Sequence, residues 1–198
     1  MLKRDLYRRI LTVVLIIVGL VCVRLLWIEP IRIHNNNMAE ALTKKENVLA
    51  IKNRKLTNLD LVAYKHDDKK YVGRVIGIPG QKVVMFDDVL YINDKIIKET
   101  YIKKNQQTFL SKYPDEEYSS DFTVGTIMGN NDQKVPSNQY LILNDNRQVK
   151  EDSRKFGLIP KDEIIGVVNF KYLPLKDFGF VQNDEAKIEN GFVASDEK

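Results

Sequence analysis

The sequence is poor in the residues that build disulfides and metal sites. It contains one cysteine, Cys22, and two histidines, His34 and His66, in 198 residues. A single cysteine excludes a disulfide within one chain and a cysteine-based zinc site, and the two histidines have no accompanying ligand cluster. The sequence therefore predicts neither a metal nor a cofactor.

The sequence also lacks an excess of charge of one sign. Its 31 Lys and Arg residues are spread among 27 Asp and Glu residues, which leaves a formal net charge of +4. This balance is typical of a solvated, mixed-charge surface, so we expect no nucleic acid partner. With 43% apolar residues, the chain is long enough for a membrane anchor and one well-buried domain.

Only one apolar run is long enough to suggest a membrane helix. It extends over residues 10–28 and follows a basic segment, residues 1–9. At about 1.5 Å per residue, a helix of about 19 residues just crosses a hydrocarbon core of roughly 30 Å. Arg24 lies near the outer end, where its side chain can reach the headgroups beside the interfacial Trp27. We expect a transmembrane helix in contact with membrane lipid, with residues 1–9 in the cytoplasm.

A cleavable secretory signal is the alternative, because it would share the basic start. The run is longer than a usual signal core, however, and no small-x-small cleavage pattern follows it. We therefore expect an uncleaved single-pass anchor in the cell membrane, with the rest of the chain extracellular.

After residue 28 the sequence changes to short β-type segments with a period close to two. A hairpin is expected where two of them are joined across Asp87-Asp88, with the type of turn open. This pattern predicts a mostly β, antiparallel domain over residues 29–181, with a small insertion at about 102–134. Residues 182–198 are polar and acidic, which is typical of a disordered tail. The expected strands are Ile31–Ile33, Val48–Ile51, Leu61–Tyr64, Tyr71–Ile78, Lys82–Phe86, Val89–Ile92, Tyr140–Leu143 and Ile164–Tyr172.

Two stretches carry a specific motif. Residues 71–80 read YVGRVIGIPG and residues 144–157 read NDNRQVKEDSRKFG. Together with Asp60-Leu61-Val62 they resemble the type I signal peptidases of the S26 family, over about residues 10–172. The resemblance implies a signal-peptidase-like antiparallel β-sheet domain behind one N-terminal transmembrane helix.

The residues expected to carry the chemistry differ from that family. The resemblance places its nucleophilic serine at Asn37, directly before Met38, and its lysine general base at Gly73. A third position, a serine that orients the lysine, corresponds to Lys150. Such residues act as a unit, and loss of one removes most of the rate enhancement. The resemblance therefore implies a catalytically degenerate member and not an enzyme.

Each of these positions also has an ordinary structural interpretation. Asn35-Asn36-Asn37 could form a polar turn, and Gly73 could be a strand glycine or bulge that allows close backbone approach. Lys150 could replace the missing base, but we favour a solvated side chain or a surface ion pair with Glu151 or Asp152. Ser153 is the other nearby hydroxyl, and the family uses it structurally.

Other residues of the motifs match the family. The residues that match are Asp60, Arg74, Asp145, Arg147, Asp152, Ser153 and Arg154. For Asp145, Arg147, Asp152 and Arg154 we favour an ion-pair network that positions their loop. In the first motif Met38 and Leu42 are kept, while Glu40 and Ala41 stand where the family has Pro-Thr. The resemblance also implies a peptide-binding cleft that includes Ile33, Met38 and Val72.

Three hypotheses on function follow. The first is a non-catalytic binding or chaperone factor that resembles the signal-peptidase-like proteins required for pilus assembly in streptococci. Its partners would be a pilin or another exported polypeptide, and a sortase. The second is an active signal peptidase with altered catalytic residues that cleaves exported preproteins. The third is a structural partner of another membrane complex.

Overall fold

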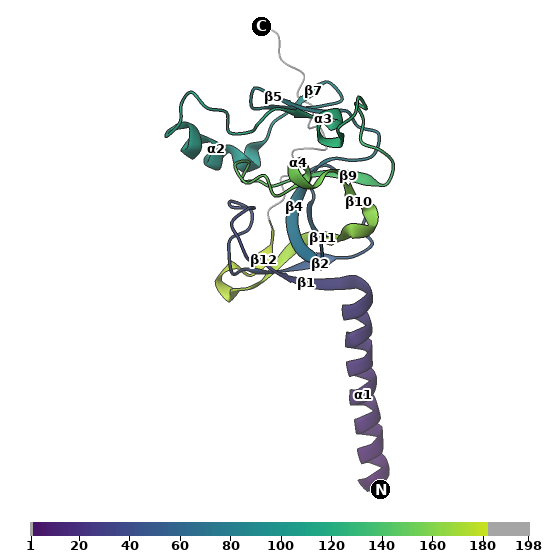
Figure 1. Cartoon of the computed structure of the whole chain (residues 1–198). Helices are drawn as coiled ribbons and strands as arrows, with labels where there is room; N and C mark the ends of the chain where they lie inside the picture. Colours follow the sequence, from purple (N-terminus) through teal and green to yellow (C-terminus); the bar gives the residue numbers. More distant parts are fainter. Residues whose placement is uncertain (1, 182–198) are drawn as a thin grey trace.

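The computed structural model describes residues 2–181, so the predicted tail 182–198 lies outside the described residues. A long N-terminal helix precedes a β domain with two sheets (Figure 1). The helices are α1 (Leu2–Trp27), α2 (Lys103–Leu110), α3 (Val124–Met128) and α4 (Ser153–Phe156), with 3-10 turns η1 (Thr100–Ile102), η2 (Lys161–Glu163) and η3 (Leu175–Asp177). The strands are β1 (Ile28–Arg32), β2 (Asn47–Ile51), β3 (Leu61–His66), β4 (Lys69–Gly77), β5 (Val83–Phe86), β6 (Val89–Ile92), β7 (Lys95–Ile97), β8 (Phe122–Thr123), β9 (Gln139–Leu143), β10 (Ile159–Pro160), β11 (Ile164–Leu173) and β12 (Gly179–Phe180).

Helix α1 projects from one end of the domain (Figure 1). Its segment Arg4–Trp27 is long and apolar enough to cross a membrane, by length and composition. The helix takes in the basic flank and stops before Ile28, so its bounds differ at both ends from the apolar run 10–28. Pro30 explains the C-terminal limit, because proline cannot continue a helix and pushes the preceding residue towards extended geometry.

The larger sheet has the strand order β1-β2-β11-β3-β4-β9-β10, with β12 on β11, and its pairings are antiparallel. This confirms the predicted fold class. The sheet coils strongly: the side chains of Glu29 in β1 and Lys70 in β4 lie 2.7 Å apart although three strands separate β1 from β4 in the order. Because each pairing on the way is antiparallel, β1 and β4 run in the same direction.

The smaller sheet has the order β7-β6-β5-β8. The predicted hairpin is confirmed, since Phe86 pairs with Val89. The two turn residues, Asp87 and Asp88, have φ angles of 50° and 59°. Positive φ at both positions is the requirement of a type I′ turn.

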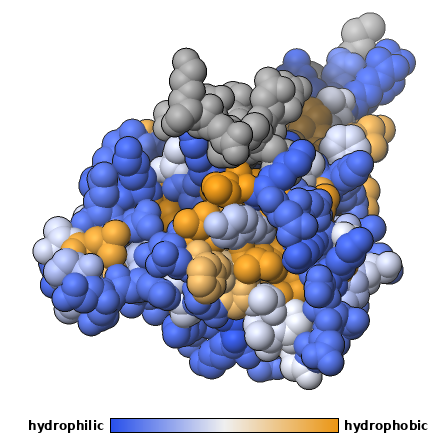
Figure 2. Space-filling model, turned by 90° about the horizontal axis from the view of Figure 1, so that it is seen from above, coloured by the Kyte–Doolittle hydropathy of each residue, from blue (hydrophilic) through white to orange (hydrophobic). Residues whose placement is uncertain are grey.

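The main core lies between the two sheets. It contains the inward residues of β5 and β6 and residues of β9, among them Val83, Met85, Leu90, Leu141 and Leu143. The alternate residues of the small sheet face outward; they are Val84, Phe86, Val89, Tyr91 and Ile96. Figure 2 looks onto the end of the domain opposite α1 and shows apolar residues gathered there within a hydrophilic surround.

Candidate functional site

The most deeply buried ion pair joins the two matching motifs. Arg74 in β4 donates from Nε and Nη2 to the two carboxylate oxygens of Asp145, at 2.8 and 2.6 Å. Nη1 donates to the carbonyl of Leu59, and the guanidinium lies 4.1 Å from the ring centre of Tyr101. Burial disfavours the charged form of Arg74, but Asp145 outweighs it and raises the pKa of Arg74. Strand β4 is thereby fixed to the loop after β9.

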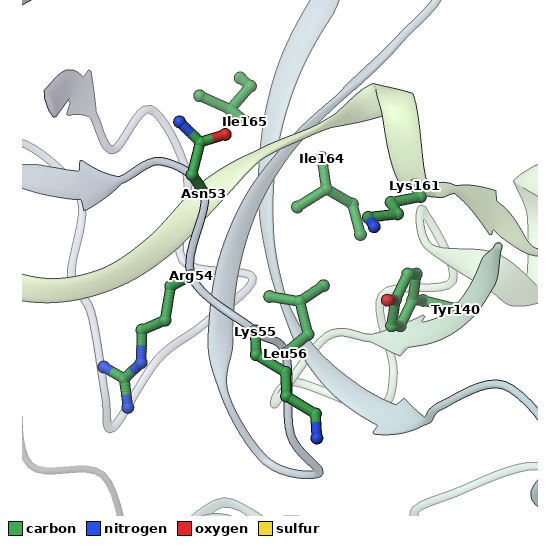
Figure 3. Close-up of a pocket in the computed structure, with 9 residues that line it drawn as sticks. Asn53, Arg54, Lys55, Leu56, Tyr140, Lys161, Ile164 and Ile165 are labelled. Carbon is green, nitrogen blue, oxygen red and sulfur yellow. The ribbon is translucent and has the colours of Figure 1, made fainter. Parts of the chain in front are cut away.

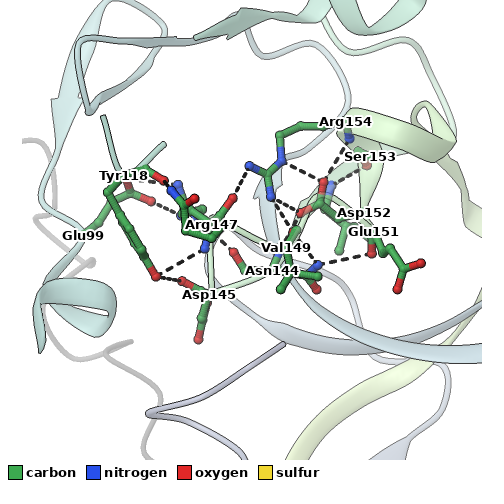
Figure 4. A network of polar contacts seen from close by, with 12 residues as sticks. Glu99, Tyr118, Asn144, Asp145, Arg147, Val149, Glu151, Asp152, Ser153 and Arg154 are labelled. Carbon is green, nitrogen blue, oxygen red and sulfur yellow. Dashed lines mark hydrogen bonds and ion pairs between the residues drawn. The ribbon is translucent and has the colours of Figure 1, made fainter. Parts of the chain in front are cut away.

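Arg147 sits at the other side of this loop and reaches outside the motif (Figure 4). Its guanidinium binds Glu99 and donates to the hydroxyl of Tyr101 at 3.1 Å. Its backbone N–H donates to the hydroxyl of Tyr118, which in turn donates to the carbonyl of Asp145 at 3.1 Å. Burial raises the pKa of both Tyr101 and Tyr118, so both hydroxyls stay protonated.

Asp152 organises the end of the loop. Its carboxylate accepts from the side chain of Arg154 at 2.9 and 2.6 Å and from the backbone N–H of Asn144 at 2.9 Å. Arg154 also donates to the carbonyls of Arg147 and Val149. The buried hydroxyl of Ser153 accepts from the N–H of Ile142 at 2.9 Å. The end of the loop is therefore fixed to Ile142 in β9 and to Asn144 directly after it, and Figure 4 shows the contacts within the loop.

Asp60 lies directly before β3 and is fully buried. Its Oδ2 accepts from the N–H and hydroxyl of Thr57, at 2.7 and 3.0 Å. Oδ1 has no hydrogen-bond partner among the described residues. Asp60 thus holds the turn before β3 and makes no ion pair with Arg74 that the structure records.

Asn37 and Met38 lie in a turn against the polar loop. The carbonyl of Asn37 accepts from the N–H of Asn146 at 2.9 Å, and its own N–H donates to the side chain of Asn35 at 3.3 Å. Met38 is 1% exposed in the core below. The run of asparagines is therefore a polar turn whose last residue borders the loop that contains Asp145.

The residue three positions after Asn37 gives this turn an unusual backbone. Glu40 has a φ angle of 97°, which the ring of a proline forbids. Its carboxylate accepts from the N–H of Asn105 at 2.5 Å, and the side chain of Asn105 donates to the carbonyl of Ala39 at 2.8 Å. Helix α2, within the predicted insertion 102–134, therefore holds this turn. The bounds of that insertion stay a prediction.

Gly73 faces a filled space. A Cβ atom added to Gly73 would lie 2.5 Å from Cγ2 of Ile142, 3.3 Å from the carbonyl oxygen of Leu143 and 3.4 Å from the ring of Tyr64. The methyl group of a β-branched residue cannot swing away as the end of a long side chain can. We therefore expect even Gly73→Ala to perturb the packing, because Ile142 of β9 lies where the first carbon of a side chain would be.

Tyr64 is fully buried, and its hydroxyl has no partner among the described residues. Burial, together with the nearby charge of Asp152, raises the pKa of Tyr64. Its ring stacks on Tyr71 at 5.7 Å. Lys150, which the sequence suggested as a replacement base, is exposed to solvent. The structure therefore places no buried amine beside Gly73 in the part of the chain that it describes.

The predicted cleft residues do come together. Ile33, Met38 and Val72 line a cavity of about 30 Å³ together with Asn37 and residues of the segments 31–35 and 70–72. Ile33 and Met38 are 4% and 1% exposed, so they belong to the core as much as to the cavity. A space of this size holds about two water molecules or a methyl-sized group.

Two free strand edges border this cavity. Within residues 2–181, β1 pairs with β2 alone, so its other edge is free. Strand β4 pairs with β9 only from Arg74 onward, so its edge over residues 69–73 is free on that side. The N–H and C=O of Ile33 point to the β2 side, at Glu46 and Lys45. Because neighbouring residues of a strand direct these groups to opposite sides, those of Arg32 face the cavity. We call this space between β1 and residues 69–73 the groove.

Glu29 closes one end of the groove. Its carboxylate lies 2.7 Å from Lys70 in β4, 3.3 Å from Lys52 and 3.2 Å from Arg24 in α1. These cations, Lys70 above all, lower the pKa of Glu29 to about 2. The cluster connects helix α1 to both edges of the groove.

The sequence did not reveal several of these residues. Glu99, Tyr101 and Tyr118 come from outside the matching motifs, and Glu29 lies just before a proline without a motif of its own. Their partners are 27 to 48 positions away or across the coiled sheet, so no local pattern marks them. The one available signal was that each matching arginine and aspartate in a buried loop must have a partner.

Comparison with known proteins defines the class. The sequence model of the family described as "Signal peptidase, peptidase S26" matches residues 5–173. The crystal structure of a signal peptidase I from Enterococcus faecalis V583 is similar, with a TM-score of 0.53 and 34% sequence identity, over 58% of this chain and 97% of that chain. The fold is therefore that of a signal peptidase.

Sequence relatives support the same family. Signal peptidase IB of Staphylococcus aureus (strain MRSA252) is 34% identical over 194 residues, which cover 93% of this chain and 98% of the relative. Signal peptidase I of Bacillus caldolyticus is 36% identical over 127 residues, 63% of this chain and 66% of the relative. The chain belongs to the S26 signal peptidase family and is a homologue of its serine endopeptidases.

Proposed function

We propose that the protein is a non-catalytic member of the signal peptidase family that binds an extended segment of an exported polypeptide and does not cleave it. The observation that carries this proposal is the filled volume beside Gly73. A general base would need a side chain there, and its first carbon would lie 2.5 Å from Cγ2 of Ile142 and 3.3 Å from the carbonyl oxygen of Leu143. Asn37 adds an amide where the family has a hydroxyl nucleophile.

The groove supports binding without cleavage. Strand addition depends on free backbone N–H and C=O groups, and those of Arg32 face the groove between two strands that run in the same direction. The small cavity at Ile33, Met38 and Val72 leaves room for a methyl-sized side chain only. Main-chain hydrogen bonds would therefore supply most of the contact.

Helix α1 supports a single-pass anchor in the cell membrane. The basic residues that begin the helix favour the cytoplasm, so the β domain would lie on the outer face. There it would meet preproteins or other polypeptides after export, as the family implies. We propose that the partner is a pilin and that the protein acts, together with a sortase, in assembly of surface pili.

Binding and cleavage can be measured in one experiment on the full-length chain in detergent micelles. A fluorescent peptide with a signal-peptide cleavage region is added, anisotropy reports binding, and mass spectrometry reports products. We expect binding that saturates and no product above the buffer background. Product formation that disappears with Ser153→Ala or Lys150→Ala would show the alternative, an active peptidase with altered catalytic residues.

A backbone variant tests whether the groove holds the peptide. Arg32→Pro removes the N–H that faces the groove, whereas Arg32→Ala keeps it and changes the same exposed side chain. We expect Arg32→Pro to weaken peptide binding at least tenfold and Arg32→Ala to leave it nearly unchanged. Charged substitutions at Ile33 are a poor test because this residue is 4% exposed and would perturb the fold.

Pilus assembly is tested in the source bacterium. Deletion of the gene should abolish high-molecular-weight pilin polymers, and the wild-type gene and Arg32→Ala should restore them. If Arg32→Pro also restored them with normal protein levels, the groove would not be the working surface. The chain would then act as a structural partner through another face.

A further inference from the structure

A cavity separate from the groove and the polar loop lies between the segment after β2 and the start of β11 (Figure 3). Its volume is about 430 Å³, within the range of sites that hold small organic molecules. The residues that matter for its chemistry are Arg54, Lys55, Leu56, Tyr140, Lys161 and Ile164. Neither the binding proposal above nor the polar loop uses any of them.

The cavity lies beside the exit of the membrane helix. The N–H of Lys52 donates to the carbonyl of Trp27 at 2.9 Å, and its amine donates to the carbonyl of Leu25 at 3.0 Å. The next residue, Asn53, already lines the cavity. Gly166 of β11, which also lines the cavity, packs so closely on Ile51 that an added Cβ would lie 2.4 Å from the Ile51 carbonyl oxygen. Both segments are therefore held next to the end of α1.

The lining is basic. It contains Arg54, Lys55 and Lys161, and among the described residues that line it none is acidic. Of the two acids on the same turn, Asp162 lines an adjoining cavity of about 730 Å³ that shares Asn53, Lys161 and Ile164 with this one, and Glu163 lies 3.9 Å from His66. An anion in this cavity would meet positive charge from two separate segments of the chain.

The remaining lining is apolar or neutral. Leu56 is 9% exposed and Ile164 is partly buried. Figure 3 shows Lys161 and Tyr140 on one side of the space and residues 53–56 on the other, with the Tyr140 hydroxyl directed towards the space. Cations and a hydroxyl next to aliphatic side chains suit a molecule with an anionic head and an apolar body.

From this position and lining we propose that the cavity binds the phosphodiester headgroup of an anionic phospholipid of the membrane that holds α1. Lys55 and Lys161 contact the phosphate oxygens, and the aliphatic wall accepts the glycerol and the start of the acyl chains. The interaction holds the domain upright on the membrane, since Lys52 and Glu29 already fix the end of α1 to the same strands. A soluble phosphate ester shares the headgroup chemistry, and the test separates the two sources.

The test uses the full-length chain in a non-ionic detergent. Phosphatidylglycerol and phosphatidylcholine with identical acyl chains are added separately, and native mass spectrometry measures the lipid that stays bound. We expect preferential retention of phosphatidylglycerol and a loss of about thirtyfold in Lys55→Gln/Lys161→Gln, since each basic residue near anionic lipid contributes about a factor of five to ten. The matched control is Lys103→Gln/Lys104→Gln, which removes two exposed lysines of α2.

Three results would overturn the proposal. The first is equal retention of the two lipids, and the second is an equal loss in the control variant, which would show a general charge effect. The third is binding of soluble glycerol 3-phosphate as tightly as the lipid, which would assign the cavity to a free phosphate ester. Circular dichroism of both variants verifies the fold, and Lys161→Gln alone provides a second, smaller loss if the double variant unfolds.

Discussion

The polar loop and the two positions beside it, Asn37 and Gly73, differ in how closely they keep the family pattern. The loop keeps its arginines and aspartates, and the side chain of every one of these is buried with a partner. Asn37 and Gly73 stand where the resemblance places the catalytic serine and lysine, and Ile142 fills the space at Gly73. On the proposed function, two neighbouring parts of one site have therefore diverged to different degrees.

Physical chemistry explains this difference. Removal of one member of a buried ion pair leaves an uncompensated charge, so residues such as Arg74 and Asp145 are constrained by the fold itself. A nucleophile or a base contributes to reaction rate and not to the fold. If binding alone is needed, as we propose, packing can fill its position, and four predictions test that contrast.

The largest effect is expected for Asp145→Asn. This change keeps the shape of the side chain but leaves the guanidinium of Arg74, 1% exposed, without its counter-charge. We expect a loss of about 3–5 kcal/mol in the free energy of unfolding, measured by denaturant titration of the full-length chain in micelles. Asp94→Asn is the control, because Asp94 is 76% exposed in its pair with Lys82 and should cost less than about 1 kcal/mol. Similar losses of stability in the two variants would contradict the claim that the buried ion pair constrains the fold more than the exposed one.

Gly73→Ala should have the second largest effect. The added methyl group meets Cγ2 of Ile142 at 2.5 Å, so we expect a loss of about 1–3 kcal/mol from overpacking. In the double variant Gly73→Ala/Ile142→Ala the methyl group finds the space left by the isoleucine. The cost of Gly73→Ala should therefore fall by more than half in the Ile142→Ala background. Additive costs would contradict the claim that Ile142 fills this position.

The pH dependence of the free energy of unfolding tests the ion pairs of Glu29 at the end of the groove. The pKa of Glu29 is lowered to about 2 in the folded chain, against roughly 4.3 in an unfolded chain. Its contribution is therefore fully present above about pH 4.5 and is lost as the pH falls towards 2. Because its partners are partly exposed, we expect about 1 kcal/mol. Glu29→Gln should be less stable than wild type by this amount at pH 6, and the difference should shrink as the pH approaches 2. A constant difference would contradict the assignment.

The smallest effect is expected for Tyr64→Phe. The hydroxyl of Tyr64 is buried without a partner among the described residues, so its removal should be neutral or should stabilise the chain by up to about 1 kcal/mol. Tyr118→Phe is the matched control. The Tyr118 hydroxyl donates to the carbonyl of Asp145, and its loss should destabilise the chain. A loss of stability in Tyr64→Phe would show that the hydroxyl has a partner.

The sequence predicted the strands because their residues alternate. The hairpin across Asp87-Asp88 is an example. Strand β7 could have been found in the same way, because the turn-forming pair Asn93-Asp94 precedes it; both of these residues have positive φ angles. Helix α3 is too short to show a period, and it depends on a capping box between Thr123 and Thr126. Helix α1 ends at Trp27 although the apolar run continues to Ile28, because Pro30 already imposes extended geometry.

The site was less predictable than the fold. Ile33, Met38 and Val72 were placed together through the resemblance, and the structure does bring them to one cavity. The neighbours of Gly73 depend on the register of β4 against β9, in which Val75 faces Ile142, and a single sequence does not fix that register. The partners of Arg147, Glu99 and Tyr101, lie in a segment without a motif, so no sequence pattern marks them.

The most direct measurement of the central claim is cleavage by a chain with the dyad put back. The full-length variant Asn37→Ser/Gly73→Lys is compared with wild type on a signal-peptide substrate, with mass spectrometry of the products. The matched control is Asn37→Ala/Gly73→Lys, which has the same lysine and no hydroxyl. We predict no product above background in any of the three chains, because the first side-chain carbon of a lysine at position 73 would lie 2.5 Å from Cγ2 of Ile142 and could not take its place without displacing that residue. Specific cleavage by the serine-lysine variant that is absent from the control would show that the position is open, and it would contradict the account.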